Sequence, residues 1–215
     1  MSSGLIIKDY GWEQPATCAH RYLLQDIDEM IRQTSIGRDA KILDAGCGGG
    51  FILKELYERG HQNIWGFDLS ESGIHLARQT YPEIKDRFEI HDAYSVNLPK
   101  SFQQGKYDLI LSIEVVEHLY SPQEYLRNVS FWLKEGGFLL ISTPYHGFLK
   151  NLGTIILGKF DSHFNPFWEG GHIKFFSKNT LNDTLKKSGL RQKRFRGSGR
   201  MPYFWKSMLI LAQKV

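Results

Sequence analysis

Short apolar runs alternate with amphipathic segments along most of this chain. The runs have the length and composition of buried strands, and the stretches between them repeat apolar residues at helical spacing. The expected strands are 41–43, 64–67, 87–91, 107–112, 133–141, 190–196 and 206–214. The expected helices are 19–33, one that stops at Gly60, one capped by Ser70, one that begins at Pro122 and is closed after Leu133 by Gly136 and Gly137, and one that runs from Ser177 to Gly189. The alternation predicts a parallel sheet with a terminal hairpin, with ligands bound at the carboxyl ends of the strands.

A glycine-rich turn follows the first expected strand, where residues 43–50 read Leu-Asp-Ala-Gly-Cys-Gly-Gly-Gly. Such a turn lets the backbone approach a ligand closely, and the amides at the start of the next helix point toward that ligand. Asp68 stands 22 residues after Gly46, where a carboxylate can accept hydrogen bonds from both hydroxyls of a ribose. Phe51 replaces the last glycine of a dinucleotide fingerprint. The pattern therefore favours a nucleoside ligand over a pyrophosphate.

The pattern Asp44-x-Gly46-x-Gly48-x-Gly50 resembles the first motif of the class I S-adenosylmethionine-dependent methyltransferases. Four more segments resemble that family's motifs in their order and spacing: residues 66–70 its ribose motif, 91–93 its adenine-side motif, and 107–112 and 133–141 its fourth and fifth strands. The similarity is closest to the broad group that contains the ubiquinone-biosynthesis O-methyltransferases. The resemblance implies an α/β fold with a doubly wound, seven-stranded, mostly parallel sheet whose last strand is reversed. It also implies an enzyme that takes a methyl group from S-adenosylmethionine.

The resemblance assigns cofactor-binding roles along one edge of the sheet. The first acid and the glycines would hold the amino-acid end of the cofactor, the second acid its ribose, and the next motif its adenine. The backbone after the fourth strand would line the methyl pocket, and an arginine of the first helix would contact the carboxylate. The residues concerned are Arg21, Asp44, Gly46, Gly48, Gly50, Asp68, Leu69, Asp92, Ala93, Ile113 and Glu114.

Two segments lie outside the alternation of strands and helices. We therefore divide a single domain, 1–215, into an N-terminal cap (1–36), a cofactor-binding core (37–143), a substrate lid (144–176) and a C-terminal helix with a strand hairpin (177–215). The lid is rich in aromatic and histidine residues, and a connection of that length in a compact domain is usually functional. Its apolar piece 152–157 is expected to form a buried helix, with a membrane-touching edge for a lipidic substrate as the alternative.

Methyl transfer from a sulfonium is a direct displacement, in which the enzyme aligns a nucleophile with the methyl group and excludes water. An oxygen nucleophile must also lose a proton, and histidine suits that step near neutral pH. His146 is the first candidate, because it follows the fifth strand at an end that faces the methyl position in the resembled family. His118 and His172 are further candidates, and packing within aromatic surroundings is the alternative for each histidine.

Residues 114–118 read Glu-Val-Val-Glu-His, so Glu114, Glu117 and His118 would share one face of a helical turn and could bind a divalent cation. The set resembles two metal-assisted branches of the family, the ubiquinone-biosynthesis O-methyltransferases and the small-RNA 3′-terminal 2′-O-methyltransferases. In the second branch a further histidine completes the site, and no downstream histidine motif matches it convincingly. A metal is therefore not favoured, and the Glu-His pair is expected to brace the turn beside the cofactor.

Length, cysteine content and charge set the remaining expectations. A chain of 215 residues can bury a stable core without disulfides, and Cys18 and Cys47 lack metal-ligand spacing. No signal-peptide pattern or membrane-length apolar run occurs, so we expect a cytoplasmic protein. The net charge is +4, but residues 184–215 hold nine of the 27 Lys and Arg residues and none of the 23 acids. We interpret this stretch as a solvated face, with attraction of phosphates, nucleic acid or anionic lipid as the less favoured alternative.

The expected acceptor is a small molecule, partly aromatic or isoprenoid-like, that is methylated on oxygen. Three other functions stay open at this point: an RNA-modifying methyltransferase that uses the basic C-terminal face, a cofactor-binding protein without turnover, and a nicotinamide-dependent oxidoreductase. The oligomeric state does not follow from the sequence.

Overall fold

The computed structural model describes residues 11–102, 106–165, 167, 168 and 170–215. Residues 1–10 of the predicted cap lie outside this part. Seven strands form one sheet in the order β3-β2-β1-β4-β5-β7-β6. The strands are β1 Ile42–Ala45, β2 Ile64–Asp68, β3 Phe88–Ile90, β4 Tyr107–Ile113, β5 Leu133–Pro144, β6 Leu190–Ser198 and β7 Ser207–Lys214. Among them β7 runs antiparallel to both its neighbours, β5 and β6, which confirms the predicted mostly parallel sheet with a reversed last strand.

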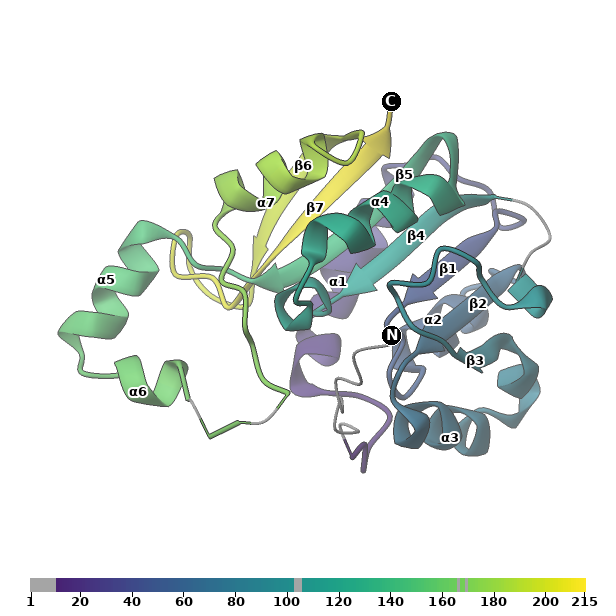
Figure 1. Cartoon of the computed structure of the whole chain (residues 1–215), viewed down its shortest axis with the longest axis horizontal. Coiled ribbons are helices and arrows are strands. Elements are labelled where there is room, and N and C mark those ends of the chain that lie inside the picture. The colour runs from purple at the N-terminus through teal and green to yellow at the C-terminus, as the bar shows by residue number, and fades with distance from the viewer. Residues whose placement is uncertain (1–10, 103–105, 166, 169) are drawn as a thin grey trace, which may run out of the picture.

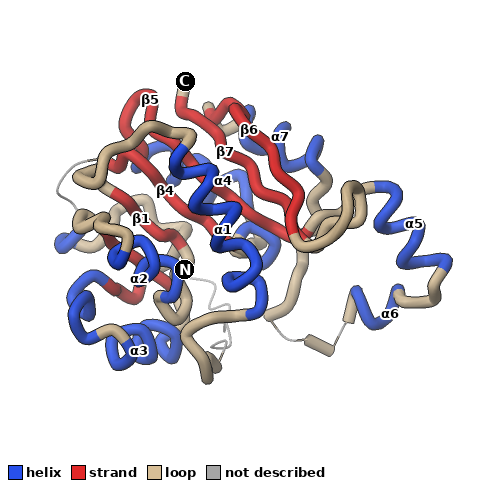
Figure 2. Tube along the Cα trace, turned by 180° about the vertical axis from the view of Figure 1, so that it is seen from behind, coloured by secondary structure: helices blue, strands red, loops and turns tan. Residues whose placement is uncertain are grey.

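Helices cover both faces of the sheet (Figures 1 and 2). The α-helices of the described part are α1 Cys18–Arg32, α2 Phe51–Glu58, α3 Glu71–Thr80, α4 Pro122–Trp132, α5 Phe148–Ile156, α6 Phe160–His163 and α7 Lys178–Lys186, and all but α5 and α6 lie on the sheet. Apolar residues of α1, α2 and α3 pack on one face, and those of α4 and α7 pack on the other. Successive residues of β4 alternate between these two cores: Leu109 and Leu111 belong to the first and Ile110 to the second. Burial on both faces explains why the strands read as continuous apolar runs.

Local signals in the sequence fix most helix starts. The Ser70 hydroxyl accepts a hydrogen bond from the Gly73 amide, and Ser177 forms a capping box with Thr180. The predicted end of α4 is wrong, because this helix ends at Trp132 and Leu133 already belongs to β5. Leu133 pairs with Tyr107, and the chain turns through Gly136 before the main pairing with β4 resumes at Phe138. The register of β5 therefore overrides the local helix-stop signal.

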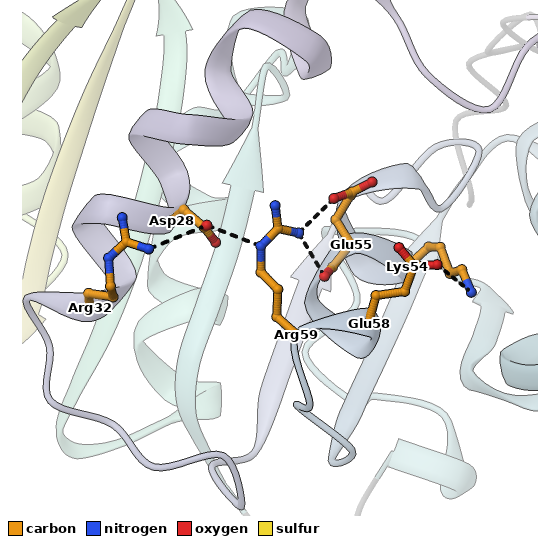
Figure 3. A network of polar contacts seen from close by, with 6 residues as sticks. All are labelled: Asp28, Arg32, Lys54, Glu55, Glu58 and Arg59. Atoms are coloured by element: carbon orange, nitrogen blue, oxygen red, sulfur yellow. Dashed lines mark hydrogen bonds and ion pairs between the residues drawn. The ribbon is translucent and has the colours of Figure 1, made fainter.

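Ion pairs join the outer parts of α1 and α2 (Figure 3). Arg59, which follows α2, lies between Asp28 of α1 at 3.0 Å and Glu55 of α2 at 2.6 Å. Lys54 and Glu58 pair along α2. Partly exposed pairs of this kind contribute about 0–1 kcal/mol each, so they hold the two helices in register more than they stabilise the fold.

Two short helices, α5 and α6, project from the sheet as a separate arm (Figures 1 and 2), which we call the α5–α6 arm, residues 148–163. The prediction that 152–157 is a buried helix is wrong, because Leu152, Ile155, Ile156 and Leu157 are exposed. This helix is amphipathic, but its buried residue is Lys150, and its apolar side chains are the exposed ones. None of the described helices is long and apolar enough to cross a membrane.

Candidate active site

Every predicted polar site residue of the core lies at or just beyond the carboxyl end of a strand. Asp44 lies in β1, Asp68 ends β2, and Asp92 follows β3 by two residues. Glu114 directly follows β4, and His146 follows β5 by two residues. Since β1 to β5 are parallel, these positions share one edge of the sheet, where ligands bind in folds of this kind.

The glycine turn depends on backbone conformations and on close packing that side chains would prevent. Gly46 and Gly48 have positive φ angles of 93° and 49°. A methyl group at Gly46 would lie 2.4 Å from Val115, and one at Gly48 would lie 2.3 Å from the ring of Trp12. The turn is tied to β2, because the Gly46 amide donates to the Phe67 carbonyl at 2.8 Å.

The Asp68 carboxylate bridges the turn and the start of α3. One oxygen accepts from the Gly48 amide at 2.8 Å, and the other accepts from the Ser70 amide at 2.9 Å. Each oxygen has a second lone pair, so both can also accept from a ligand hydroxyl. The backbone therefore orients this acid for the ribose role that the sequence predicts.

Asp44 is 2% exposed, and its Oδ1 has no hydrogen-bond partner among the described residues. Burial, with the Asp68 carboxylate as a second cause, raises the pKa of Asp44 to about 7. An acceptor that is buried without a donor needs an explanation, and a cationic ligand amine would provide both the missing donor and a countercharge.

The other predicted cofactor residues surround these two acids. Gly50 caps α2 in the left-handed conformation, and Ile113 is buried at the end of β4. The Asp92 carboxylate accepts from the Tyr94 amide at 2.9 Å, which shapes the turn through Ala93. The side chains of Leu69 and Arg21, which the sequence analysis predicts to contact the cofactor, are both exposed, and that of Leu69 is 41% exposed.

A stack of rings that the sequence analysis did not predict lies beside the turn. Trp12 packs against Gly48 and Gly73, and its backbone amide donates to the Ser72 hydroxyl at 3.0 Å. The rings of Trp12, His20 and Phe51 are nearly parallel, with centroids 6.2 and 6.3 Å apart. Burial lowers the pKa of His20 to about 4, so this imidazole is neutral at pH 7 and acts as part of an apolar stack. The N-terminal segment therefore covers the glycine turn from one side.

Glu114 lies at the centre of a hydroxyl network. Ser142 of β5 donates to Oε1 at 2.8 Å, and Ser207 of β7 donates to Oε2 at 3.2 Å. The Tyr22 hydroxyl of α1 lies 2.6 Å from the Ser207 hydroxyl. Two strands, and α1 through Ser207, thus fix the orientation of a single carboxylate at the end of β4.

The backbone and the charge of Glu114 are both unusual. Its φ angle of 56° lies in the left-handed region, which a glutamate rarely adopts and which is strained. Burial raises its pKa to about 7, although the Ser142 and Ser207 hydrogen bonds and the nearby Lys150 oppose that shift. A strained carboxylate that changes protonation near neutral pH is typical of a functional site.

Glu117, His118 and His172 come together next to this network. Their ligand atoms lie within 4.8 Å of one another, and His172 takes the place that the sequence analysis gave to Glu114. Glu117 is 0% exposed, and neither of its carboxylate oxygens has a hydrogen-bond partner among the described residues. His118 Nδ1 lies 2.9 Å from the Gly170 carbonyl oxygen, so this nitrogen carries the proton and Nε2 is the acceptor of the neutral ring. The cluster has the donor types that suit a divalent transition metal.

His146 is buried among aromatic and histidine rings of residues 163–175. The centroids of Phe175, His163 and Phe164 lie 5.1, 5.5 and 5.7 Å from its own. Burial and then the Lys150 charge lower the pKa of His146 to about 4. A neutral imidazole with so low a pKa is a weak proton acceptor at pH 7.

Residues 18–192 match the family described as "Methyltransferase domain". The chain belongs to this methyltransferase family. The match covers most of the chain and includes every site residue predicted from the sequence, which confirms the family predicted from the glycine turn and the motifs that follow it.

Curated relatives of this methyltransferase domain include ubiquinone biosynthesis O-methyltransferases. The protein of that name from Coxiella burnetii is 29% identical over 163 residues, which are 75% of this chain and 68% of the relative. The mitochondrial protein of that name from Candida albicans is 27% identical over 178 residues, which are 80% of this chain and 53% of the relative. The chain thus spans about half of the Candida relative.

Solved structures confirm the fold. Magnesium protoporphyrin IX methyltransferase from Synechocystis PCC 6803, crystallised with bound SAH, matches 96% of this chain and 90% of its own with a TM-score of 0.64 and 19% identity. The [4+2]-cyclase SpnF matches 94% of this chain and 85% of its own with a TM-score of 0.71 and 14% identity. Because a cyclase shares the fold, the architecture by itself does not fix the reaction.

Proposed function

We propose that this methyltransferase domain transfers the methyl group of S-adenosylmethionine to a hydroxyl oxygen of a small acceptor by direct displacement. The observation that carries the proposal is the meeting of Asp44, the glycine turn, Asp68 and Glu114 at one sheet edge. The first three suit a nucleoside that carries an amino acid, and Glu114 suits an acceptor that must lose a proton. Displacement needs no covalent intermediate, so alignment and exclusion of water are the main tasks of the site.

The cofactor would lie across the carboxyl ends of β1 and β2. Asp68 would accept from the ribose hydroxyls while the Gly48 and Ser70 amides hold it in place. The unpartnered oxygen of Asp44 would accept from the ammonium of the methionine end. These two acids would thus recognise opposite ends of the same ligand.

Glu114 is our candidate for the proton acceptor. Hydrogen bonds from the Ser142 and Ser207 hydroxyls orient its carboxylate. Its pKa of about 7 matches a general base that works near neutral pH. His146 and His118, the candidates from the sequence, stay predictions, and burial lowers the pKa of both rings. In this scheme the two imidazole rings line the acceptor site, and Glu114 removes the proton.

A divalent cation is compatible with the same site. Glu117, His118 and His172 would hold it. The buried carboxylate oxygens of Glu117 and the oriented imidazole of His118 fit that role. The ion would act as a Lewis acid that lowers the pKa of the acceptor hydroxyl.

Removing metal ions from an active preparation tests this addition. We expect a strong chelator to lower turnover by about tenfold or more, and Zn²⁺, Mn²⁺ or Mg²⁺ to restore it. His172→Ala should become insensitive to both treatments. Full turnover of the chelated wild type would leave the three residues with a bracing role alone.

The test of the main proposal is transfer of a labelled methyl group. The purified protein should bind S-adenosylhomocysteine in a calorimeter, and an excess of NAD⁺ should not displace that ligand. It should also methylate members of a panel of catechols and prenylated phenols. Glu114→Gln provides the matched inactive protein for this assay. Cofactor binding without any methylated product would favour a non-catalytic role, and labelling of RNA would favour the nucleic-acid alternative.

Ion pairs reduce the case for RNA as the acceptor. Arg196 of the basic C-terminal stretch lies 2.6 Å from Asp26 and 2.8 Å from Glu29 of α1, and Lys214 lies 2.8 Å from Glu135. Partner acids thus neutralise part of the cluster.

Both cysteines are free, which agrees with the reducing, cytoplasmic setting that we propose.

A further inference from the structure

The α5–α6 arm exposes the side chains that a surface helix normally buries. Phe148 is 78% exposed and Ile156 is 73% exposed, whereas the buried residue of α5 is Lys150. Surface helices of globular proteins show the reverse arrangement, with apolar residues inside and lysines outside. Exposed apolar side chains also include Leu149, Ile155, Leu157 and Phe160. A contiguous apolar surface of this kind marks an interaction site.

The loop between β6 and β7, residues 199–206, extends this surface. A methyl group built at Gly153 would lie 3.4 Å from the Phe204 ring, so the loop packs against α5. Lys150 Nζ donates to the Lys206 carbonyl at 3.2 Å, which joins the two segments again. Met201 and Tyr203 are exposed on the loop. The arm and this loop therefore form one surface that carries both aliphatic and aromatic side chains.

Basic residues flank the apolar side chains. Lys159 on the arm and Arg200 and Lys206 on the loop are exposed. The sequence of residues 145–168 and 184–215 contains a single acid, Asp161. The surface therefore combines apolar area with positive charge and suits an occupant that is apolar inside and anionic at its boundary.

We propose that the α5–α6 arm and the 199–206 loop dock this protein on the surface of a lipid bilayer that carries anionic headgroups. The apolar side chains would enter the boundary between headgroups and acyl chains, and the flanking cations would stay among the phosphates. A second copy of the chain fits less well, because a symmetric contact would bring the cations of both copies together. The arm begins four residues after the carboxyl end of β5, so docking would turn the ligand-binding edge of the sheet toward the bilayer.

Sedimentation with vesicles tests this surface, and it requires neither cofactor nor methyl transfer. The wild type should sediment with vesicles of phosphatidylcholine that contain about one third phosphatidylglycerol, and much less with phosphatidylcholine alone. Added salt should weaken the binding to the anionic vesicles. The pair Ile155→Asp and Ile156→Asp should lower the partition coefficient by about tenfold or more, because both side chains leave the apolar boundary.

The control is Phe131→Asp, since Phe131 is 56% exposed on α4 and Ile155 is 59% exposed on the arm. This control should sediment like the wild type, and both variants should bind S-adenosylhomocysteine like the wild type. Absence of wild-type binding to anionic vesicles would overturn the proposal, as would equal binding by the arm variant. A dimer in sedimentation velocity that the arm variant dissociates would overturn it too, by assigning the surface to a second copy.

Discussion

Replacing Asp68 by asparagine should weaken the binding of S-adenosylhomocysteine by roughly 10- to 100-fold, because charge-assisted hydrogen bonds to the ribose contribute about 1–3 kcal/mol. The carboxylate already accepts from the Gly48 and Ser70 amides. An asparagine side chain has one acceptor oxygen, so its NH₂ group would face one of these donors. The substitution thus removes both the charge and the geometry of the ribose site. Isothermal titration calorimetry measures the change directly.

A stability measurement must accompany this titration. Losing a backbone hydrogen bond at the turn also costs about 1–3 kcal/mol of unfolding free energy, so urea denaturation should show a folded but less stable protein. Glu58→Gln is the matched control, because Glu58 is an exposed acid that pairs with Lys54 (Figure 3) and ends α2, whereas the glycine turn precedes the first residue of that helix. If Asp68→Asn binds the ligand as tightly as the wild type, the ribose must be held elsewhere.

Replacing Glu114 by glutamine should lower kcat by roughly 10²- to 10⁴-fold, the range typical of a lost general base. Affinity for the cofactor should change little, because the amide still occupies the same hydroxyl network. With saturating S-adenosylmethionine, whose ammonium keeps Asp44 ionised, kcat/KM for the acceptor should rise with pH through about 7 in the wild type, since the Glu114 carboxylate accepts a proton only above its pKa. The glutamine variant should lack this rise. The groups around the Glu114 carboxylate are Ser142, Ser207, Lys150 and Glu117. Burial, and then the charge of Glu114, raise the pKa of Glu117 well above its usual range.

The pH profile distinguishes Glu114 from the histidine candidate. A profile governed by His146 would turn over near pH 4, where burial places the pKa of that ring. His146→Gln should keep the rise near 7 and lose at most part of its rate. A Glu114→Gln enzyme with wild-type kcat and an unchanged profile would exclude Glu114 as the base.

The fold was predictable because each signal was local or repeated. Two-sided burial produced continuous apolar strands, and Ser70, Ser177 and the glycine turn marked the neighbouring helix starts. Parallel pairing then placed the strand ends on one edge. The ribose acid could be found from sequence for the same reason, because its distance from the turn reflects one strand-helix-strand unit.

The proton-accepting network was not predictable from local pattern. Ser207 is 93 residues from Glu114, and Tyr22 is 185 residues from Ser207, so only the assembled sheet and α1 bring them together. Helical spacing grouped Glu114 with Glu117 and His118, but the positive φ of Glu114 turns its backbone away from that regular geometry. His172 joined the cluster instead, from a lid without a recognisable histidine motif.

The exposure of α5 was also beyond the sequence signals. The apolar positions of a helix have the same pattern in the sequence whether protein or another apolar phase covers them. The outcome depends on which elements reach the helix. Here the 199–206 loop packs against it at Gly153, and its remaining sides stay exposed.

The reversed direction of β7 has a consequence for how the molecule is made. β6 is synthesised before β7, but β7 pairs between β5 and β6. Until β7 is in place, β5 therefore has an open edge, and β6 has no neighbouring strand in this sheet. The first residue of β7 is Ser207, which reaches Glu114. The insertion of β7 between β5 and β6 thus both closes the sheet and gives the carboxylate its second hydroxyl donor.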